Sequence, residues 1–334
     1  MNGVRVGSQT IAFPSCPRLI AMHTVVGKQE GQGPYAEYFH EILADDLLGQ
    51  KTPEKAERQI LEQTIDQALR KQGLVPQDIQ YYVGGDLLNQ VISTVFSARS
   101  LEVPFLGIFS ACGTFSQGLG LASVLLQGGF ADKVLVATSS HYQTAERQYR
   151  YPIELNVQHV STNQHTVTGA GACVLAADGE GPKITHATFG KVVDMGLKNP
   201  NDMGSAMAPA ALATLEQHLA DTGRSPDYYD LILTGDLGRQ GLKMLRILAE
   251  KKNLQLNNVA DGGALIYGDN PKFGAGASGA ACSAVMTLGY VNTQLFLGKL
   301  HKVLLIGTGA MLNQLTIQQG ESIPTIAHAA AIEA

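Results

Sequence analysis

The hydrophobic and polar positions are most regular between residues 105 and 141, where two short apolar runs flank a longer amphipathic segment. The runs cover 105–109 and 134–137, and the segment between them covers 115–126. Short apolar runs bounded by glycine and polar residues are typical of buried strands, whereas a periodic segment of this length is typical of a helix. The pattern therefore predicts a strand, a tight turn, a helix and a second strand, with Cys112 on the turn.

Two interpretations of Cys112 follow from this position. The start of a helix offers free N–H groups and a partial positive charge, which favour a thiolate, and Gly113 leaves room for a ligand's carbonyl or carboxylate. A free cysteine between small residues is also a common buried hydrophobe. The strand-to-helix context favours a functional site, though not necessarily a catalytic one.

The same criteria predict the remaining elements. Further strands are expected at 4–13, 79–83, 171–176, 184–189, 231–233 and 302–305. An amphipathic piece covers 35–48, and further helices are expected at 53–72, 207–219, 242–252 and 274–290. The stretch 149–166 has no clear period, and a loop of that length in a compact domain is usually functional or disordered.

The second part of the chain repeats the pattern of the first. Six residues between 73 and 90 meet identical residues at a constant offset of 150, and Asp86 thereby matches Asp236. Matches in the same order along the chain predict two related α/β halves. A turn-rich joint divides the chain into a first half at 1–179 and a second half at 180–334.

Composition narrows the classes of function. The 334 residues carry a net charge of −5 without a basic stripe, which argues against a nucleic-acid partner. The four cysteines lie far apart with no C-x-x-C pair, which argues against a zinc site or a disulfide framework and suggests a reducing compartment. No secretory signal is visible and no apolar run approaches the roughly 20 residues of a membrane span, so we expect a soluble protein.

Two fused α/β halves with a cysteine at the first helix turn resemble the thiolase superfamily of condensing enzymes. Ala111-Cys112-Gly113 is similar to the A-C-x motif of its ketoacyl synthases, and 167–172 is similar to their G-x-G-A-G-A segment. The thiolase motif G-A-S-G-A is matched by 276–280. The resemblance covers nearly the whole chain and implies an α/β, thiolase-like fold with two duplicated halves in five α-β-α-β-α layers.

Departures from the superfamily bear on the chemistry. Its condensing enzymes combine the cysteine nucleophile with two histidines, or a histidine and an asparagine, from loops of the second half. Here one of those loops reads Thr234-Gly235-Asp236, and Phe273 occupies the place of the other histidine. An anion at Asp236 would oppose the enolate charge that condensation develops. We therefore expect a catalytically degenerate protein, although Cys112 remains.

Within the superfamily, the chain resembles the stage V sporulation protein AD family of spore-forming bacteria. The cues are S-A-C-x-T at 110–114, A-T-S-S-H at 137–141, T-V-T-G-A-G-A at 166–172 and Gly-Asp-Leu loops at 85–87 and 235–237. The resemblance implies a non-catalytic protein without a cofactor that binds dipicolinic acid, with accompanying Ca²⁺ left open, and assists its uptake into the developing spore. It also implies membrane-protein partners of the same operon and a peripheral place on the cytoplasmic side of the forespore or spore inner membrane. A homodimer is left open.

Candidate ligand residues follow from the flat dianion that the resemblance implies. Cys112 and Gly113 would supply N–H groups at a helix start. His141 follows a strand at the carboxyl edge, where open α/β sheets bind ligands, although a surface or core histidine is an equal alternative. We expect the ligand in a cleft where the loops after Val83, Phe109, Ala137 and Leu233 converge.

The charged candidates have structural alternatives. Asp86 and Asp236 would cap the following helices or carry Ca²⁺ with water. Arg147 and Arg150 would pair with carboxylates, whereas a solvated charge is the stronger expectation for either. The remaining cysteines are expected to be structural: Cys16, Cys173 and Cys282.

Two other functions stay open. Cys112 alone would suffice to form a thioester in a degenerate acyl-CoA enzyme, either a hydrolase or a transferase. The chain would otherwise be a structural partner of another thiolase-like subunit. Intact-mass analysis after incubation with acyl-CoA identifies the enzyme, and calorimetry with dipicolinate separates the ligand-binding protein from the structural partner.

Overall fold

The computed structural model describes residues 4–150 and 160–334. The strands of these ranges are β1 (Val4–Val6), β2 (Thr10–Ala12), β3 (Arg18–Val26), β4 (Glu41–Ile42), β5 (Tyr81–Gly85), β6 (Phe105–Gly107), β7 (Lys133–Ser140), β8 (Gln164–Thr166), β9 (Gly169–Ala176), β10 (Lys183–Phe189), β11 (Leu231–Thr234), β12 (Val259–Asp261), β13 (Gly276–Ser278), β14 (Lys302–Ala310) and β15 (Thr325–Glu333). The α-helices are α1 (Pro53–Arg70), α2 (Ile92–Leu101), α3 (Thr114–Gln127), α4 (Tyr142–Tyr149), α5 (Met203–Thr222), α6 (Gly238–Lys251), α7 (Gly262–Ile266), α8 (Ala280–Val285), α9 (Asn292–Phe296) and α10 (Gln314–Gln318). A π-helical turn, Met286–Val291, joins α8 to α9.

The strand order repeats itself in the two halves. One path runs β12-β11-β14-β15-β10-β3-β9-β7-β5-β6. From β3 outward, two antiparallel pairings are followed by two parallel pairings, and the same sequence of pairings holds from β10 outward. The identical order confirms the predicted duplication, whereas the boundary between 179 and 180 stays a prediction. The two halves of the path join at one residue pair, Lys183 opposite Arg18.

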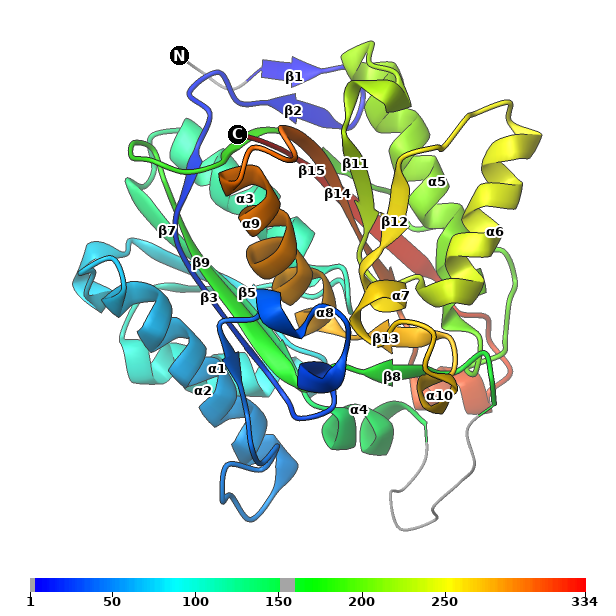
Figure 1. Ribbon diagram of the computed structural model, residues 1–334, viewed down its shortest axis with the longest axis horizontal. Helices are drawn as coiled ribbons and strands as arrows, with labels where there is room; N and C mark the ends of the chain where they lie inside the picture. The colour runs from blue at the N-terminus through cyan, green and yellow to red at the C-terminus, as the bar shows by residue number, and fades with distance from the viewer. Residues whose placement is uncertain (1–3, 151–159) are drawn as a thin grey trace.

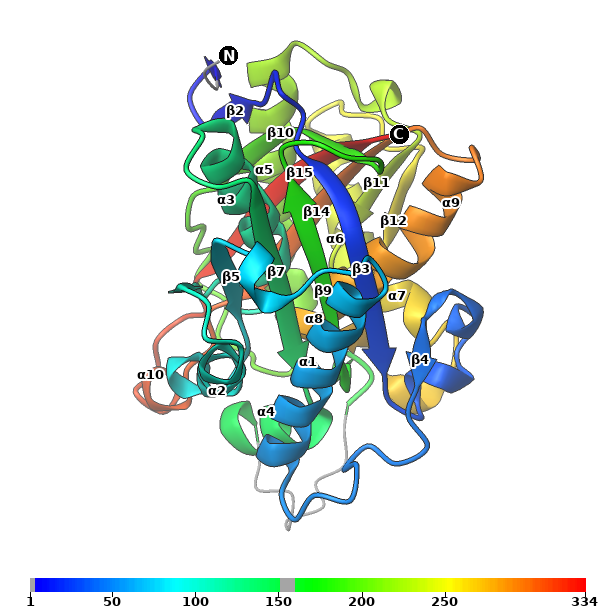
Figure 2. The ribbon, with the colours of Figure 1, turned by 90° about the vertical axis from the view of Figure 1, so that its left-hand side faces the viewer.

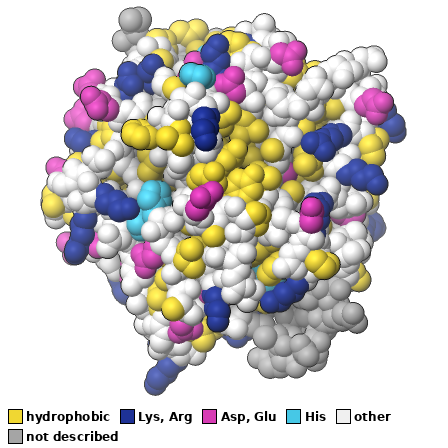
Figure 3. Space-filling model, viewed as in Figure 1, with side chains coloured by type: hydrophobic (Ala, Val, Ile, Leu, Met, Phe, Trp, Pro, Cys, Tyr) yellow, Lys and Arg dark blue, Asp and Glu magenta, His cyan; other side chains and the backbone are white. Residues whose placement is uncertain are grey.

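Helices cover both faces of these strands in five layers (Figure 1). Helices α1 and α2 lie outside the first-half strands, as the turned view shows (Figure 2), and α5 and α6 lie outside those of the second half. Between the two sets of strands lie α3 and the helices α8 and α9. Hydrophobic side chains gather near the centre of the face in Figure 3, over the region between α9 and β12 in Figure 1.

Small residues let α3 fit between the two sets of strands. A Cβ at Gly118 would lie 2.8 Å from the Val136 side chain on β7, and one at Gly120 would lie 2.9 Å from the Phe189 ring on β10. The helix is therefore buried against both halves, which explains why its sequence is rich in glycine, alanine and serine. Helix α1 starts as predicted, because the Thr52 hydroxyl accepts the N–H of Lys55 and Pro53 occupies the first position.

Several predicted elements differ from those observed. The expected strand at 4–13 is broken into β1 and β2 by a turn at Gly7, whose φ is +63°. Segment 35–48 forms no α-helix and instead contains a short 3-10 helix at Ala36–Tyr38 and the strand β4. The expected helix from 274 begins only at Ala280, because Gly276 and Gly279 adopt φ values of +118° and +112° that a helix does not allow. Strand β3, which lies between β10 and β9, and the C-terminal β15 were not expected at all.

The aperiodic stretch 149–166 is only partly described. Helix α4 ends at Tyr149 and β8 begins at Gln164, while 151–159 lie outside the described residues. In the described ranges, no helix has both the length and the apolar character needed to cross a bilayer.

Candidate functional site

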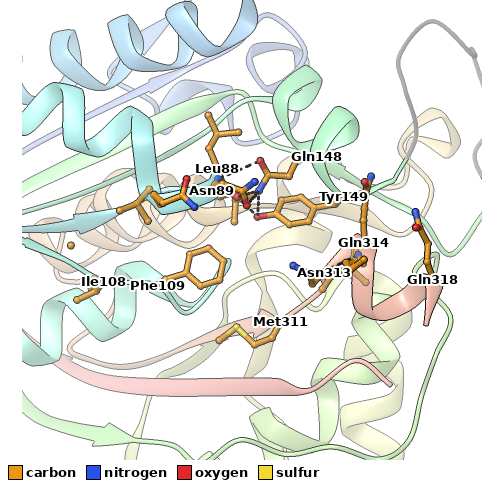
Figure 4. A pocket seen from close by; sticks show the side chains of 16 residues that line it. Leu88, Asn89, Ile108, Phe109, Gln148, Tyr149, Met311, Asn313, Gln314 and Gln318 are labelled. Carbon is orange, nitrogen blue, oxygen red and sulfur yellow. Dashed lines mark hydrogen bonds between the residues drawn. The ribbon is translucent and has the colours of Figure 1, made fainter. Parts of the chain in front are cut away.

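A cleft of about 810 Å³ lies beyond the carboxyl ends of β5, β6 and β14 (Figure 4). Its walls are the loop after β5, the residues after β6, the end of α4 and the segment from Met311 to α10. Of the four expected walls, those after β5 and β6 are present, whereas the segment after β7 contributes the end of α4 and not its loop. The fourth wall follows β14 instead of β11, because β14 lies next to β15 in the middle of the path and its carboxyl end faces the first half.

The cleft lining is uncharged. Its polar side chains are carboxamides: Asn89, Gln90, Gln148, Asn313, Gln314 and Gln318. Its apolar side chains include Phe109 and Met311, and Figure 4 shows both beside the open space, with the Tyr149 ring opposite them. Each carboxamide offers two donors and an acceptor without a net charge. The arrangement suits a flat ligand with polar edges and no net charge.

Strained backbone lies in the wall of this cleft. Gln90 and Val91 have φ values of +58° and +48°, which side-chain-bearing residues rarely adopt. Two consecutive left-handed residues cost free energy that the surrounding contacts must supply, and such residues cluster at functional sites. A shallower extension of about 460 Å³ continues past Gln90 to Glu54 and Arg147.

The Tyr149 side chain separates this cleft from a smaller cavity. Its hydroxyl donates to the carbonyl oxygen of Leu87, and the Gln148 Nε2 donates to the same oxygen at 3.0 Å. Tyr149, Leu87 and Leu312 line both spaces. The inner cavity holds about 30 Å³, which is room for about one or two water molecules.

Cys112 lines the inner cavity, and the structure corrects the expectation that its position favours a thiolate. Helix α3 begins two residues later, at Thr114, and the N–H of Gly113 is already bonded to the Ser110 carbonyl at 2.9 Å. Burial, followed by the neighbouring Asp236 carboxylate, raises the pKa of the Cys112 thiol well above its usual value. Cys112 is therefore a neutral thiol that faces an acid.

Gly113 faces the other half of the molecule and not the cleft. A Cβ at this position would lie 3.2 Å from the Ser110 oxygen and 3.3 Å from the carbonyl oxygen of Gly307 on β14. A bulky residue would therefore press on the contact between the halves. Protein backbone thus fills the space beside Gly113, where room for a ligand's carbonyl or carboxylate was expected.

Asp86 and Asp236 occupy equivalent places, after β5 and after β11, and both are buried. The Asp86 carboxylate accepts the N–H groups of Leu88 and Thr94 at 2.9 and 2.8 Å, and the Thr94 hydroxyl at 2.6 Å. It therefore caps the start of α2, which is one of the two roles expected for it.

Asp236 makes different contacts from its counterpart. Its carboxylate accepts the Thr308 hydroxyl at 2.8 Å and the N–H of Gly279 at 3.1 Å. Burial raises the pKa of Asp236 to about 7. A protonated or half-protonated acid beside a neutral thiol lacks the paired base that activates a cysteine nucleophile.

His141 caps α4 with its side chain. Its Nδ1 accepts the N–H of Gln143 at 3.2 Å, so its Nε2 carries the hydrogen that it donates to the Asp46 carbonyl at 3.1 Å. Burial lowers the pKa of this histidine. Both nitrogens of the neutral ring thus have protein partners, and a ligand contact by His141 stays a prediction.

The two arginines have separate surroundings. Arg147 pairs with Glu54 at 2.7 Å on the rim of the cleft extension, and both side chains are exposed. Arg150 lines the inner cavity, where its Nη1 donates to the Gln164 carbonyl at 2.8 Å and its Nε lies 3.1 Å from Glu146. The charge of each arginine is thus balanced by a glutamate.

Phe273, at the place where the resemblance suggests a histidine, is a packing residue. Phe273 stacks on Tyr267 with ring centroids 3.9 Å apart and meets His165 edge-on at 5.1 Å. Cys282 is buried on α8 with its Sγ 3.4 Å from the Gly235 carbonyl oxygen. Because Asp236 influences the Cys282 thiol as well, Cys282 is a poor distant control for experiments on Cys112. Cys173, on β9, is buried without such a neighbour.

A serine–histidine pair behind Cys112 is not a nucleophile and its base. His328 Nε2 lies 3.0 Å from the Ser110 hydroxyl. Its Nδ1 accepts the N–H of Gly190 at 3.2 Å, so Nε2 carries the hydrogen and donates it to Ser110. The Ser110 hydroxyl in turn donates to Gln117 at 2.8 Å. The imidazole has no free lone pair with which to activate the serine.

Most of the cleft side chains were not predicted from the sequence. Gln148 and Tyr149 lie at the end of α4, a helix that was not predicted, and only Tyr149 belongs to the stretch 149–166 that was expected to be a loop. Met311, Asn313 and Gln314 follow β14, and no motif marks them. The polar pair Asn313-Gln314, shortly after β14, was an available signal, because carboxyl ends of parallel strands meet at one edge of a sheet.

Comparison with solved structures shows the fold. The chain is 16% identical to the 3-oxoacyl-[acyl-carrier-protein] synthase III of Aquifex aeolicus, with a TM-score of 0.58 and coverage of 95% of this chain and 100% of that one. It is 14% identical to Xanthomonas campestris OleA crystallised with lauric acid and lauroyl-CoA, with a TM-score of 0.55 and coverage of 98% and 99%. At these identities the likeness shows a thiolase-like fold alone.

Comparison of sequences shows the family. The family described as Stage V sporulation protein AD (SpoVAD) matches residues 7–333. The Stage V sporulation protein AD of Bacillus subtilis (strain 168) is 44% identical over 328 residues, which are 98% of this chain and 97% of that protein. The chain therefore belongs to the stage V sporulation protein AD family and has the thiolase-like fold predicted for it.

Proposed function

We propose that this sporulation protein binds dipicolinic acid in the cleft between Phe109, Tyr149 and Met311, catalyses no reaction on it, and assists its uptake into the developing spore. The observation that carries the proposal is the contrast between the two spaces. The outer cleft is large and uncharged, whereas the cavity at Cys112 has room for about one or two water molecules only. The ligand therefore belongs in the outer cleft.

The uncharged lining favours the calcium chelate over the free acid. Dipicolinate is a dianion, and no Lys, Arg or His lines the larger part of the cleft in the residues described. One Ca²⁺ neutralises the ligand, and carboxamide oxygens such as those of Gln148 and Asn313 are among the ligands that calcium accepts. The ion would arrive on the dipicolinate, and Asp86 and Asp236 would remain structural.

Peripheral association with the spore inner membrane and with membrane proteins of the same operon belongs to the same proposal. Its support is membership of the sporulation family. A pull-down with detergent-solubilised operon proteins, with and without calcium dipicolinate, tests the association. Recovery of no operon protein under either condition would contradict it.

Calorimetry tests the ligand and its place together. Parent protein should bind calcium dipicolinate about tenfold more tightly than dipicolinate in chelator-treated buffer. Phe109→Ala should weaken binding about tenfold, because an aromatic contact contributes about 1 kcal/mol beyond the buried area it removes. Phe130→Ala is the matched control, since Phe130 is an exposed phenylalanine outside the cleft. Equal affinities for both variants would place the ligand elsewhere.

The acyl-CoA alternative is less well supported. A thioester at Cys112 requires a thiolate, and the raised thiol pKa beside Asp236 opposes one. Purified protein incubated with acetyl-CoA or malonyl-CoA should show no added mass and no condensation above the blank. An acyl adduct that is lost in Cys112→Ala would overturn this part of the proposal.

A further inference from the structure

Glu57 is a fully buried carboxyl group behind the cleft. It lies in the second turn of α1, next to α4, which packs beside this end of α1 (Figure 2). Its Oε1 accepts the Ser139 hydroxyl at 3.1 Å, and its Oε2 lies 2.8 Å from the Thr144 hydroxyl. No cation is among its hydrogen-bond or salt-bridge partners in the described residues, which is unusual for a buried glutamate.

The hydrogen-bond geometry assigns a proton to Glu57. The Thr144 hydroxyl also lies 2.9 Å from the His141 carbonyl oxygen, and it has one hydrogen for two acceptors. Both contacts are full, unshared hydrogen bonds when Glu57 donates through Oε2 and Thr144 donates to His141. Burial, and then the Asp86 charge, raise the pKa of Glu57 to about 8, in agreement with this chain of donors.

The charged groups around Glu57 make its ionisation costly. Asp86 and Glu54 exert the strongest charge effects on it, and both are acids. All of the bonded neighbours of Asp86 are donors, so Asp86 is the ionised member of the pair. The titratable or charged side chains on the other elements packed against α1 are Arg18 and His23 on β3, Arg99 on α2, Lys133 on β7, Cys173 on β9, and His141, Tyr142, Glu146, Arg147 and Tyr149 at α4.

Both walls that adjoin Glu57 contribute to the cleft. Thr144 belongs to α4, which carries Gln148 and Tyr149 into the cleft, and Asp86 fixes the loop that carries Asn89 and Gln90. Ionised Glu57 would compete for the only Thr144 hydrogen and would place a second negative charge near Asp86. Either effect weakens the packing of α4 against the loop that Asp86 holds.

We propose that Glu57 is a positioning residue whose proton holds α4 and the Asp86 loop in the arrangement that forms the cleft, so that ligand binding weakens when Glu57 ionises. The inference deepens the proposed function and rests on it only for the choice of ligand. The inference predicts that ligand affinity falls as pH rises. If only the protonated form binds, affinity at pH 9 is about tenfold weaker than at pH 7.

Calorimetry with calcium dipicolinate at pH 7 and pH 9 tests the inference on the parent, Glu57→Gln and Glu62→Gln. Glutamine keeps a donor toward Thr144 but cannot ionise, so Glu57→Gln should bind equally well at both pH values. Glu62→Gln removes an acid that lies farther along the same helix and should show the parent's tenfold loss. Parallel losses in all three proteins, or no loss in the parent, would overturn the inference.

Hydrogen exchange separates this inference from the choice of ligand. Without ligand, amides of 86–94 and 142–149 in the parent should open about tenfold more often at pH 9 than at pH 7 after correction for intrinsic rates, and Glu57→Gln should not. If the amides open in this way but calorimetry finds no ligand binding at either pH, the role of Glu57 is supported and the proposed function is contradicted. Unchanged opening in the parent would overturn that role, as would failure of Glu57→Gln to fold at pH 7.

Discussion

The two aspartates that the repeat aligns have different roles in the two halves. Asp86 and Asp236 follow corresponding strands at corresponding places, yet Asp86 caps the start of α2 and Asp236 bonds to Thr308 and Gly279. In the second half the capping role belongs to Asp261, which accepts the N–H groups at the start of α6. The two aligned aspartates thus hold corresponding positions, but the helix that follows is capped by Asp86 in the first half and by Asp261 in the second.

This difference explains why the halves contribute unequally to the site. Asp86 stiffens a first-half loop that lines the cleft, and Asp236 faces Cys112 in the interior. The Cys112 thiol is thereby kept neutral, and the accessible space lies next to the Asp86 loop. The cavity at Cys112 and the open cleft share three lining residues: Leu87, Tyr149 and Leu312.

The largest expected effect is on stability. Asp86→Ala leaves two backbone N–H groups and a hydroxyl without their buried acceptor, and we expect it to lower the free energy of unfolding by about 3 kcal/mol. Asp236→Ala removes a costly buried acid together with its bonds and should lower it by about 1 kcal/mol. Urea denaturation at pH 7 measures both values. Equal losses, or a larger loss for Asp236→Ala, would contradict the assignment of different roles.

The next effect is on the pH dependence of stability. The folded-state pKa of Asp236, about 7, lies above the usual value near 4. The folded state therefore keeps a proton that the unfolded state has lost, so this contribution is complete below pH 4 and disappears as pH rises through 7. Asp236→Asn should remove a slope of about 1.4 kcal/mol per pH unit within this range.

Asp66→Asn is the matched control for that titration, because Asp66 is an exposed acid on α1 paired with Arg70. Its unfolding free energy should follow the parent's pH dependence. A slope for Asp236→Asn that equals the parent's would show that Asp236 is ionised throughout.

A smaller effect concerns thiol reactivity. Removing the Asp236 charge lowers the pKa of Cys112, which increases the thiolate fraction and reduces its intrinsic nucleophilicity. The net result for a fall of one pKa unit is an alkylation rate about threefold higher. Iodoacetamide labelling of Asp236→Asn at pH 8, followed by peptide mass analysis, measures it, with Cys173 as the internal control. An unchanged or slower rate at Cys112 would mean that Asp236 does not act on the thiol.

The smallest effect is expected for His141, which, like Asp86, caps a helix of the first half. Both ring nitrogens bond within the protein, so His141→Ala should cost about 1 kcal/mol of stability. Its affinity for calcium dipicolinate should stay within about threefold of the parent's. A loss of more than tenfold in a variant with native circular dichroism would show that His141 touches the ligand.

Much of the fold could be predicted from the sequence because buried strands and capped helices leave local patterns. The strand–turn–helix around Cys112 and the start of α1 at Pro53 depend on short-range signals, and the repeat at an offset of 150 reveals the duplication. Strand β3 was missed because prolines precede it and because His23 and Thr24 interrupt its apolar run. The turn at Gly7 and the late start of α8 depend on backbone angles that residue types only suggest.

Less of the site could be predicted, because its walls come from distant segments. The repeat pointed to Asp86 and Asp236 but not to their different partners, which depend on how β14 and α8 pack between the halves. A thiolate at Cys112 was expected from the helix start alone. Once the thiol is buried, desolvation and then Asp236 determine its pKa, and neither is visible in the sequence. The carboxamides of Gln148 and Asn313 have no motif, so only the assembled fold brings them together.

A crystal structure of the protein with calcium dipicolinate tests the central claim most directly. We predict the ring of the ligand between Phe109, Tyr149 and Met311, with the calcium ion near carboxamide oxygens and the Tyr149 hydroxyl still bonded to Leu87. Ligand density in the cavity at Cys112 with Tyr149 displaced would contradict the account, and so would crystals grown at saturating ligand whose cleft holds none.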